Sequence, residues 1–248
     1  MKLLNSHTIR NISAVFLAMV LMASSSASAA LLGNVTRAEI KEVVNPIYPM
    51  SLSSMGIYEG SATLLIELDS EGKMTDWLAV SASKPEFVTA LERVIDKWTF
   101  TPATRDGENI PYALSVNVKF KSEGIMMAVN GVQMVQAYLY GRFDTHEERL
   151  VSQYSELDKM PTPVNIVQPK VFSDIPEEGR DGYVVLGFFI DNEGNVRMPV
   201  LMEYEGDIRL AYSAYDALVQ WKFEAPKVNG KTTMCRASQK FIFTSGKK

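Results

Sequence analysis

The sequence has little of what catalytic or metal-binding proteins usually carry. It contains one cysteine, Cys235, so no disulfide can form within the chain. It has two histidines, and only His146 lies outside the leader predicted below, which excludes a zinc site built on several histidines. No His-Glu-x-x-His pattern, Gly-x-Ser-x-Gly elbow or glycine-rich phosphate loop is present. A Ser-His-Asp triad stays open in principle, because its members need not be neighbours in sequence. We expect a non-enzymatic protein without a metal or a small-molecule cofactor.

The charge balance also lacks a basic excess. The formal net charge is −4, whereas a nucleic-acid-binding protein needs a basic face to replace the counterions of the phosphates. Nucleic acid is therefore not an expected partner. With 46% hydrophobic and 22% charged residues, the composition excludes a disordered, collagen-like or coiled-coil chain and predicts a globular fold.

The first 29 residues have the features of a secretory signal. Lys2 and Arg10 form a positively charged segment before the apolar run Ile12–Ala23. Residues 27–29 supply the small-x-small pattern that signal peptidase requires. The apolar run is shorter than the roughly 20 residues that a membrane anchor needs. We expect residues 1–29 to be cleaved on export; retention as an uncleaved tether is the alternative.

The remaining sequence contains one pattern twice, at an offset of about 122 to 123 residues. The repeated features are a glycine, an Asp-x-Glu-Gly turn, a Trp-x-Phe triplet, a second glycine and a phenylalanine. They are Gly60, Asp69–Gly72, Trp98–Phe100, Gly107 and Phe120 in the first copy, and Gly182, Asp191–Gly194, Trp221–Phe223, Gly230 and Phe243 in the second. We therefore predict two copies, residues 45–121 and residues 163–244.

Each copy is predicted to be a ββαβ unit of the α+β class. Runs rich in β-formers flank the Asp-x-Glu-Gly turn, an apolar stripe at helical spacing follows, and an alternating segment closes the copy. The predicted elements are strands 61–68 and 74–80, helix 85–98 and strand 112–120, and in the second copy strands 183–190 and 196–204, helix 207–221 and strand 233–243. Because a three-stranded antiparallel sheet has one apolar face to cover, the helix should pack on it, with Trp98 and Trp221 in the core.

Residues 122–162 are predicted to connect the copies as a helical segment. Apolar residues recur at helical spacing from Val132 to Leu157, with Gly141 as a break, and prolines 161 and 163 end the segment. The segment lacks the Gly/Ser or Pro richness of a flexible tether.

The repeat resembles the C-terminal domain of TonB, the periplasmic energy transducer of Gram-negative bacteria. The resemblance rests on Asn45-Pro46-Ile47-Tyr48-Pro49, Glu59-Gly60, the Asp-x-x-Gly hairpin, Trp98-x-Phe100-x-Pro102-Ala103 and Asp106-Gly107. It implies the same ββαβ fold and a periplasmic location. The second copy keeps Gln168-Pro169, Trp221-x-Phe223 and Gly230 but has Val171-Phe172 in place of Tyr-Pro.

The resemblance implies a binding mode and a site. Domains of this family capture an extended segment of an outer-membrane protein by adding it as a strand to the edge of the third strand. Carried over to this chain, the docking edge is strand 112–120 of the first copy. The implied peptide-binding residues are Asn45, Pro46, Tyr48, Leu114, Ser115, Val116, Asn117 and Val118.

The sequence departs from a transducer, since it has a cleavable signal and no long Pro-rich spacer. The favoured hypothesis is an adaptor in envelope transport that binds a periplasmic or outer-membrane protein segment through the first copy. The alternative is a structural or assembly protein whose sheet edges are consumed by packing between the copies or between subunits of a homo-oligomer. The two hypotheses differ in whether the third strand has a free edge.

Overall fold

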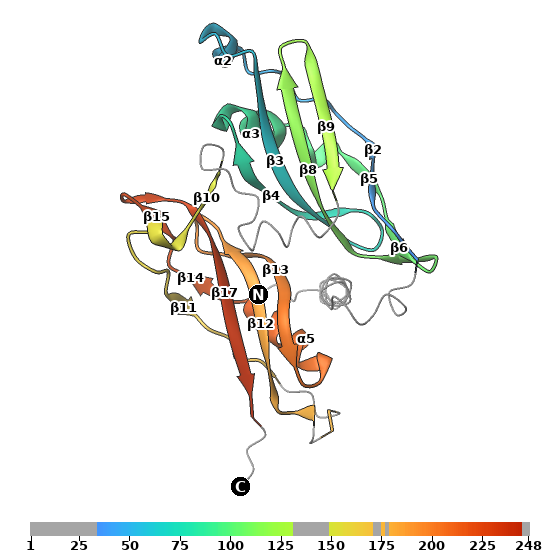
Figure 1. Ribbon diagram of the computed structural model, residues 1–248, viewed down its shortest axis with the longest axis vertical. Helices are drawn as coiled ribbons and strands as arrows, with labels where there is room; N and C mark the ends of the chain where they lie inside the picture. Colours follow the sequence, from blue (N-terminus) through green and yellow to red (C-terminus); the bar gives the residue numbers. More distant parts are fainter. Residues whose placement is uncertain (1–33, 131–148, 171–174, 177–178, 245–248) are drawn as a thin grey trace, which may run out of the picture. The chain divides into compact units, whose positions relative to one another are not determined.

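The computed structural model describes residues 34–130, 149–170, 175–176 and 179–244, and the chain divides after Leu150 into two compact units (Figure 1). The predicted leader, residues 1–29, lies outside the described residues, as do residues 131–148 of the predicted connector and Val171-Phe172. We call residues 30–150 the first unit and residues 151–248 the second unit. Both contain mostly strands with few helices, so the α+β class is confirmed.

The first unit is built on a four-stranded antiparallel sheet in the order β4-β3-β8-β9 (Figure 1). Its strands are β3 (Glu59–Leu68), β4 (Met74–Ala82), β8 (Tyr112–Lys121) and β9 (Gly124–Asn130). Helix α3 (Pro85–Glu92) begins at a proline, which suits a first helical turn, and packs on β3 and β4. The predicted helix 85–98 is shorter than expected, because a 3-10 turn at Ile95–Lys97 replaces its last part.

Strand β9 corrects two predictions. The sheet has four strands, not three, and residues 124–130, assigned to a helical connector, are a strand that pairs with β8 from Lys121↔Gly124 to Ser115↔Asn130. Ser122 and Glu123 form a two-residue turn, which brings the next residues back alongside β8. Ile125 and Met127 then lie opposite Phe120 and Val118. Ile125 and Met127 are partly buried, and Phe120 and Val118 are buried.

The second unit repeats this sheet in the order β10-β17-β12-β13 (Figure 1). Its strands are β10 (Val151–Ser152), β12 (Gly182–Ile190), β13 (Val196–Glu205) and β17 (Met234–Phe243). Helix α5 (Ile208–Leu218) begins after Asp207, whose side chain accepts a hydrogen bond from the Arg209 backbone N–H at 2.9 Å. The predicted helical connector is wrong here too, because β10 and the 3-10 turn Tyr154–Glu156 occupy its described end.

The core of each unit lies between the sheet and its helix. In the second unit, apolar residues of α5 pack with alternate residues of the three long strands, including Cys235, Phe241 and Phe243. Burial raises the pKa of the Cys235 thiol to about 12, so this cysteine is part of the core and not a reactive group. Trp98 and Trp221 are 4% and 9% exposed, which confirms their predicted place in the cores.

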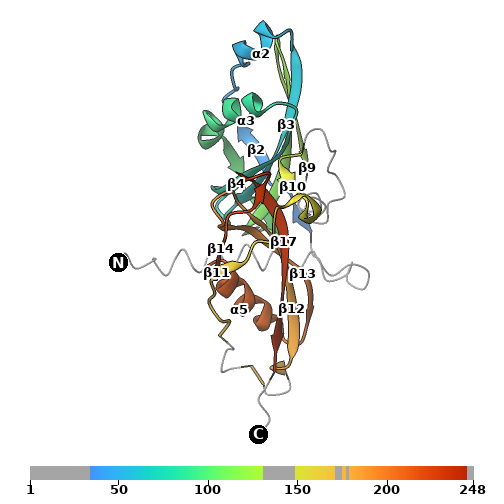
Figure 2. The same ribbon diagram turned by 90° about the vertical axis from the view of Figure 1, so that its left-hand side faces the viewer.

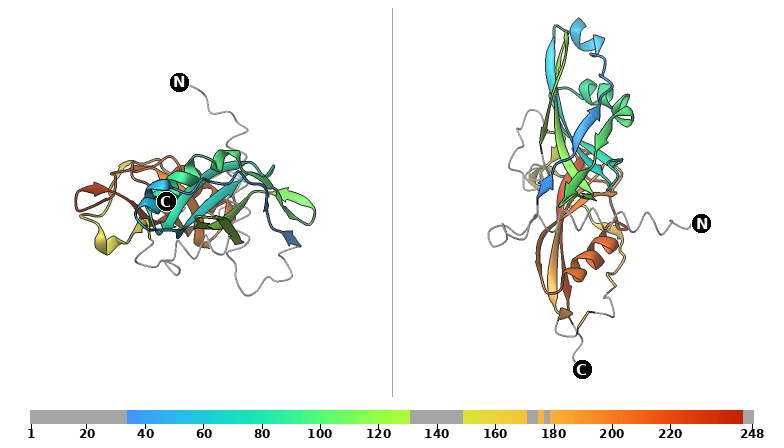
Figure 3. Two further views of the ribbon diagram at one scale, coloured as in Figure 1. Left: turned by 90° about the horizontal axis from the view of Figure 1, so that it is seen from above. Right: turned by 90° about the vertical axis from the view of Figure 1, so that its right-hand side faces the viewer.

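Both units carry a strap, residues 34–49 and residues 158–170, that crosses the helix side of the sheet (Figures 2 and 3). In the first unit β2 (Glu39–Glu42) pairs with β5 (Thr99–Thr101), and in the second β11 (Pro163–Asn165) pairs with β14 (Lys222–Phe223). The indole N–H of Trp98 donates to the Val44 carbonyl at 3.0 Å, and that of Trp221 donates to the Val167 carbonyl at 2.8 Å. Donor and acceptor are 54 residues apart in both cases, so the duplication extends into the straps.

The two Asp-x-Glu-Gly turns have the same hydrogen bonds. Asp69 Oδ1 accepts from the backbone N–H groups of Glu71 and Lys73, both at 2.9 Å, and Asp191 Oδ1 accepts from those of Glu193 and Asn195 at 2.9 and 2.8 Å. Each turn ends in a glycine with a positive φ, as a short hairpin requires. These aspartates therefore hold the hairpins that the sequence predicts.

The remaining elements are short. They are β1 (Val35–Thr36), α2 (Met50–Ser54), β6 (Ala103–Arg105), β7 (Glu108–Ile110), β15 (Lys227–Val228) and β16 (Lys231–Thr232). The hairpins β6-β7 and β15-β16 turn at Asp106-Gly107 and Asn229-Gly230, the positions that the repeat predicts.

Candidate peptide-binding edge

The strand predicted to be the docking edge is an inner strand. β8 pairs with β3 along its whole length and with β9 from Ser115 to Lys121 (Figure 1). Ser115, Val116 and Val118 are buried, and the side-chain amide of Asn117 donates to Thr63 Oγ1 at 2.9 Å. The expectation of a free edge in the first copy is therefore wrong, because the next segment of the same chain occupies it.

The strap residues predicted for the site lie on the helix side of this sheet. Asn45 is exposed, Pro46 is buried, and the Tyr48 hydroxyl donates to the Ile57 carbonyl at 2.9 Å. The Tyr48 ring packs edge-on against Phe87 of α3, with ring centroids 5.6 Å apart. Phe87 in turn contacts Phe120, so this cluster lies on the helix side, whereas Ser115 and Asn117 have the opposite parity and face away from the helix. The strap residues are therefore separated from Ser115 and Asn117, whereas Leu114, Val116 and Val118 have the parity of Phe120 and share the helix side with them.

The equivalent strand of the second unit has an open edge. β17 pairs with β12 from Cys235 to Phe243, but on its other side β10 pairs with only Met234 and Cys235. Within the described part of the chain, no strand lies beside Arg236–Phe243 on that side (Figure 1). This stretch is long enough to pair with a peptide of about six to eight residues in extended conformation.

Two side chains contact the backbone along this edge. Burial raises the pKa of the Tyr154 phenol, and a hydrogen bond with the Ser238 backbone partly offsets this rise. The Gln239 side-chain amide donates to the Lys240 carbonyl at 2.8 Å. In the first unit the Ser122 N–H donates to the Tyr58 carbonyl on the β3 side, so the N–H groups of Ser115, Asn117 and Lys119 face β9. The repeat places Ser238, Lys240 and Ile242 at these positions, so their N–H groups point toward the open edge.

The side chains bordering the edge differ between its two faces. Phe241 and Phe243 belong to the core beneath α5. Ser238, Lys240 and Ile242 are exposed on the opposite face, with Ile242 71% exposed. The Lys240 ammonium lies 3.9 Å from the ring centroid of Tyr183 on the neighbouring strand, and β17 contains Arg236 and Lys240 but no acidic residue.

The repeat relates the open and the covered edges residue by residue. The contact of Trp98 with Val44 and that of Trp221 with Val167 are offset by 123 residues. At this offset, the stretch Ser115–Lys121 of β8, which β9 covers, corresponds to Ser238–Thr244 at the end of β17. The first unit thus has β9 beside this stretch, whereas no described strand of the second unit lies beside the equivalent stretch of β17. Gly124 after Ser122-Glu123 is the sequence signal for this strand; nothing in the sequence singled out Tyr154 or Gln239.

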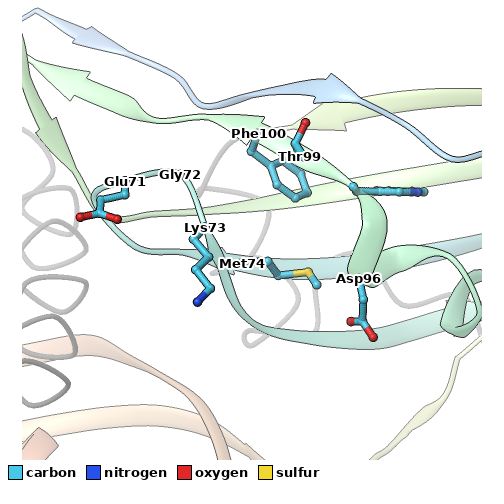
Figure 4. Close-up of a pocket in the computed structure, with 8 residues that line it drawn as sticks. Glu71, Gly72, Lys73, Met74, Asp96, Thr99 and Phe100 are labelled. Atoms are coloured by element: carbon cyan, nitrogen blue, oxygen red, sulfur yellow. The ribbon is translucent and has the colours of Figure 1, made fainter. Parts of the chain in front are cut away.

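A shallow cavity of about 390 Å³ is a second candidate site, in the first unit (Figure 4). It lies between the first hairpin turn and the Trp-x-Phe triplet, and its lining residues are Glu71, Gly72, Lys73, Met74, Asp96, Trp98, Thr99 and Phe100. At the equivalent place in the second unit, the Lys222 ammonium donates to Asn195 Oδ1 at 2.6 Å across the gap. The cavity therefore follows from the shorter Thr99 side chain, and no other feature of it indicates a ligand.

The comparisons with known proteins agree with the repeat. In the described part of the chain, no helix is long and apolar enough to cross a membrane, and no group of three potential metal ligands occurs. The family described as Gram-negative bacterial TonB protein C-terminal matches residues 44–122 and 175–244. A search of curated proteins found no match to the chain.

Proposed function

Because the chain belongs to the family of Gram-negative TonB C-terminal domains, we propose that it binds an extended segment of a partner protein at the open edge of β17. Domains of this family are non-enzymatic modules of envelope transport that interact with outer-membrane proteins. An adaptor role in the periplasm, after removal of residues 1–29, is part of the proposal.

The open edge of β17 is the observation that supports this proposal most directly. Backbone N–H and C=O groups of an unpaired edge bond readily to an added strand, and alternate side chains then select the partner. The outward-facing groups of Ser238, Lys240 and Ile242 have no strand beside them among the described residues. The two side-chain contacts, from Tyr154 and Gln239, meet only part of this hydrogen-bonding capacity.

The proposal moves the binding site from the first copy to the second. The Tyr48-Pro49 and Trp98-x-Phe100 patterns favour the first copy by sequence, but its third strand already pairs with β9. A partner could use the first unit only by displacing seven paired residues, whereas at β17 it displaces two side-chain contacts. The second unit therefore offers the lower barrier to strand addition.

A second candidate function is assembly, in which the edge of β17 pairs with the same edge of another copy of this chain. The observation that favours it is the first unit itself, where the chain covers an equivalent edge with its own residues. Light scattering of the purified protein separates the two functions. A concentration-dependent dimer that Lys240→Pro abolishes would favour assembly, and a monomer would favour partner binding.

The test of the proposed function is capture of partners from periplasmic and outer-membrane fractions by the mature chain. Lys240→Pro deletes an outward N–H and places the proline ring where a strand would approach. Lys240→Ala is the matched control, because it removes the same side chain and keeps the N–H. We expect the native chain and Lys240→Ala to capture the same protein, with less captured by Lys240→Ala because it lacks the charge, and we expect none with Lys240→Pro. Equal capture by all three proteins would refute binding at this edge.

A further inference from the structure

The structure also indicates what kind of segment the β17 edge accepts, an inference that rests on the proposed function. We infer that the segment runs antiparallel to β17 along Ser238–Phe243, with apolar side chains beside Phe241 and Phe243 and an acidic side chain beside Lys240. β9 in the first unit is the internal template for this inference.

The direction follows from the template. β9 runs antiparallel to β8, and its pairs with Ser115–Lys121 translate to pairs with Ser238–Thr244 on β17. The outward N–H groups have the same parity on both strands, since Ser115 corresponds to Ser238. β10 is the parallel strand at this edge, and it ends after pairing with Cys235, where Gln153 and Glu156 cap the following turn. The stretch beyond Cys235 is therefore open to a strand of the opposite direction.

The apolar preference follows from the helix side of the sheet. On β9, Ile125 and Met127 lie opposite Phe120 and Val118. The repeat places Phe243 and Phe241 at these two positions of β17, and both are less than 8% exposed while they border the open edge. Apolar side chains of an added strand would cover the outer sides of these rings, as Ile125 and Met127 do in the first unit.

The acidic preference follows from the opposite face. Ala128 of β9 pairs with Asn117, which corresponds to Lys240. Glu203 and Glu205 lie two strands away on β13, so Lys240 is the charge nearest to the open edge within this stretch of the sheet. The aromatic ring of Tyr183 holds the Lys240 ammonium on this face. A carboxylate on the adjacent strand would then form a cross-strand ion pair, whereas a cation would be repelled.

The experiment uses peptides copied from β9 and the whole mature chain. One heptapeptide carries the sequence of Gly124–Asn130 with Ala128→Glu, and its control carries Ala128→Lys. By calorimetric titration, we expect the Glu peptide to bind between about 2-fold and 30-fold tighter than the Lys peptide, because the attraction of one cross-strand pair and the repulsion of the other add. In Lys240→Glu the order of the two peptides should reverse.

A nitroxide on the peptide N-terminus tests the direction. In an antiparallel complex it should broaden the amide signal of Ile242 more than that of Ser238, and Lys240→Pro, which keeps both amides, should abolish the broadening. Equal affinities of the two peptides, no reversal in Lys240→Glu, no binding of either peptide, or stronger broadening at Ser238 would each overturn the inference. If Lys240→Pro still abolishes partner capture, these outcomes overturn the inference and leave the proposed function intact. The proposed function itself fails only if Lys240→Pro captures the partner as well as the native chain does.

Discussion

Prolines at two equivalent positions, Lys119 in β8 and Ile242 in β17, should have different effects on stability. Both side chains are exposed, and both N–H groups point away from the central partner strand. The Lys119 N–H faces β9, where Met126 is its cross-strand partner, whereas no described strand faces the Ile242 N–H. Lys119→Pro therefore breaks a ladder hydrogen bond and pushes β9 away, and Ile242→Pro does neither.

The magnitudes follow from the lost contacts. Removal of a ladder bond costs about 0.5 to 1.5 kcal/mol, and the carbonyl left without its donor adds about 1 kcal/mol or more. We expect Lys119→Pro to lower the free energy of unfolding by about 1.5 to 3 kcal/mol and Ile242→Pro by less than about 1 kcal/mol. For units of this size, 1 kcal/mol corresponds to a shift of roughly 4 to 8 °C in melting temperature.

The assay is thermal unfolding of the mature chain, with Lys119→Ala and Ile242→Ala as controls for the side chains. Hydrogen exchange adds a local measurement, since the Lys119 amide should be protected and the Ile242 amide should exchange rapidly. If Ile242→Pro destabilised the chain as much as Lys119→Pro, or if the Ile242 amide were protected, the edge of β17 would be bonded in the free protein. The proposed site would then be wrong.

Four further predictions concern other parts of the chain. Trp221→Ala should destabilise the second unit by roughly 3 to 5 kcal/mol in denaturant unfolding, since it deletes a buried indole that also bonds the strap; an unchanged transition would show that the strap does not depend on the indole. Cys235 should resist a thiol-reactive disulfide at pH 8 until the chain unfolds, because burial raises its pKa to about 12, and rapid labelling of the native chain would contradict this. Hydrogen bonds from Arg209 lower the pKa of the Asp207 carboxyl to about 2, so its contribution to stability is complete above about pH 4 and is lost as the pH falls toward 2; Asp207→Asn should remove this part of the acid dependence, measured as the unfolding midpoint between pH 2 and 5. Mass spectrometry of the exported protein should find a mature chain that begins near Ala30, and retention of Met1–Ala29 would contradict the predicted leader.

Local patterns predicted most of each unit. The Asp-x-Glu-Gly turns, the helix stripes and the Trp-x-Phe triplets depend on short-range chemistry, and both copies place them as expected. The straps were not predicted, because a pairing such as that of β2 with β5 joins residues about 60 positions apart.

Edge occupancy could not be read from local sequence. Ser115 and Ser238 occupy equivalent positions in similar strands, yet β9 covers the first and only the Tyr154 hydroxyl reaches the second. Strand β9 was missed because Ile125–Val129 is a continuous apolar run without alternation, followed by helical spacing. Which edge stays open is decided by the segments that follow or precede each copy, and not by the copies themselves.

The position of β17 has a consequence for the order of folding. It is the last of the described strands, it pairs with β12 along most of its length and with β10 only at Met234 and Cys235, and it supplies Cys235, Phe241 and Phe243 to the core. The hairpin β12-β13 and α5 emerge earlier but cannot close that core alone. A chain that is truncated before Phe241, or that is still being exported at that point, therefore has a second unit without one of its three long strands. Completion of this core must wait for Phe241 and Phe243, so a nonsense change just before them would be as damaging as one in the middle of the unit.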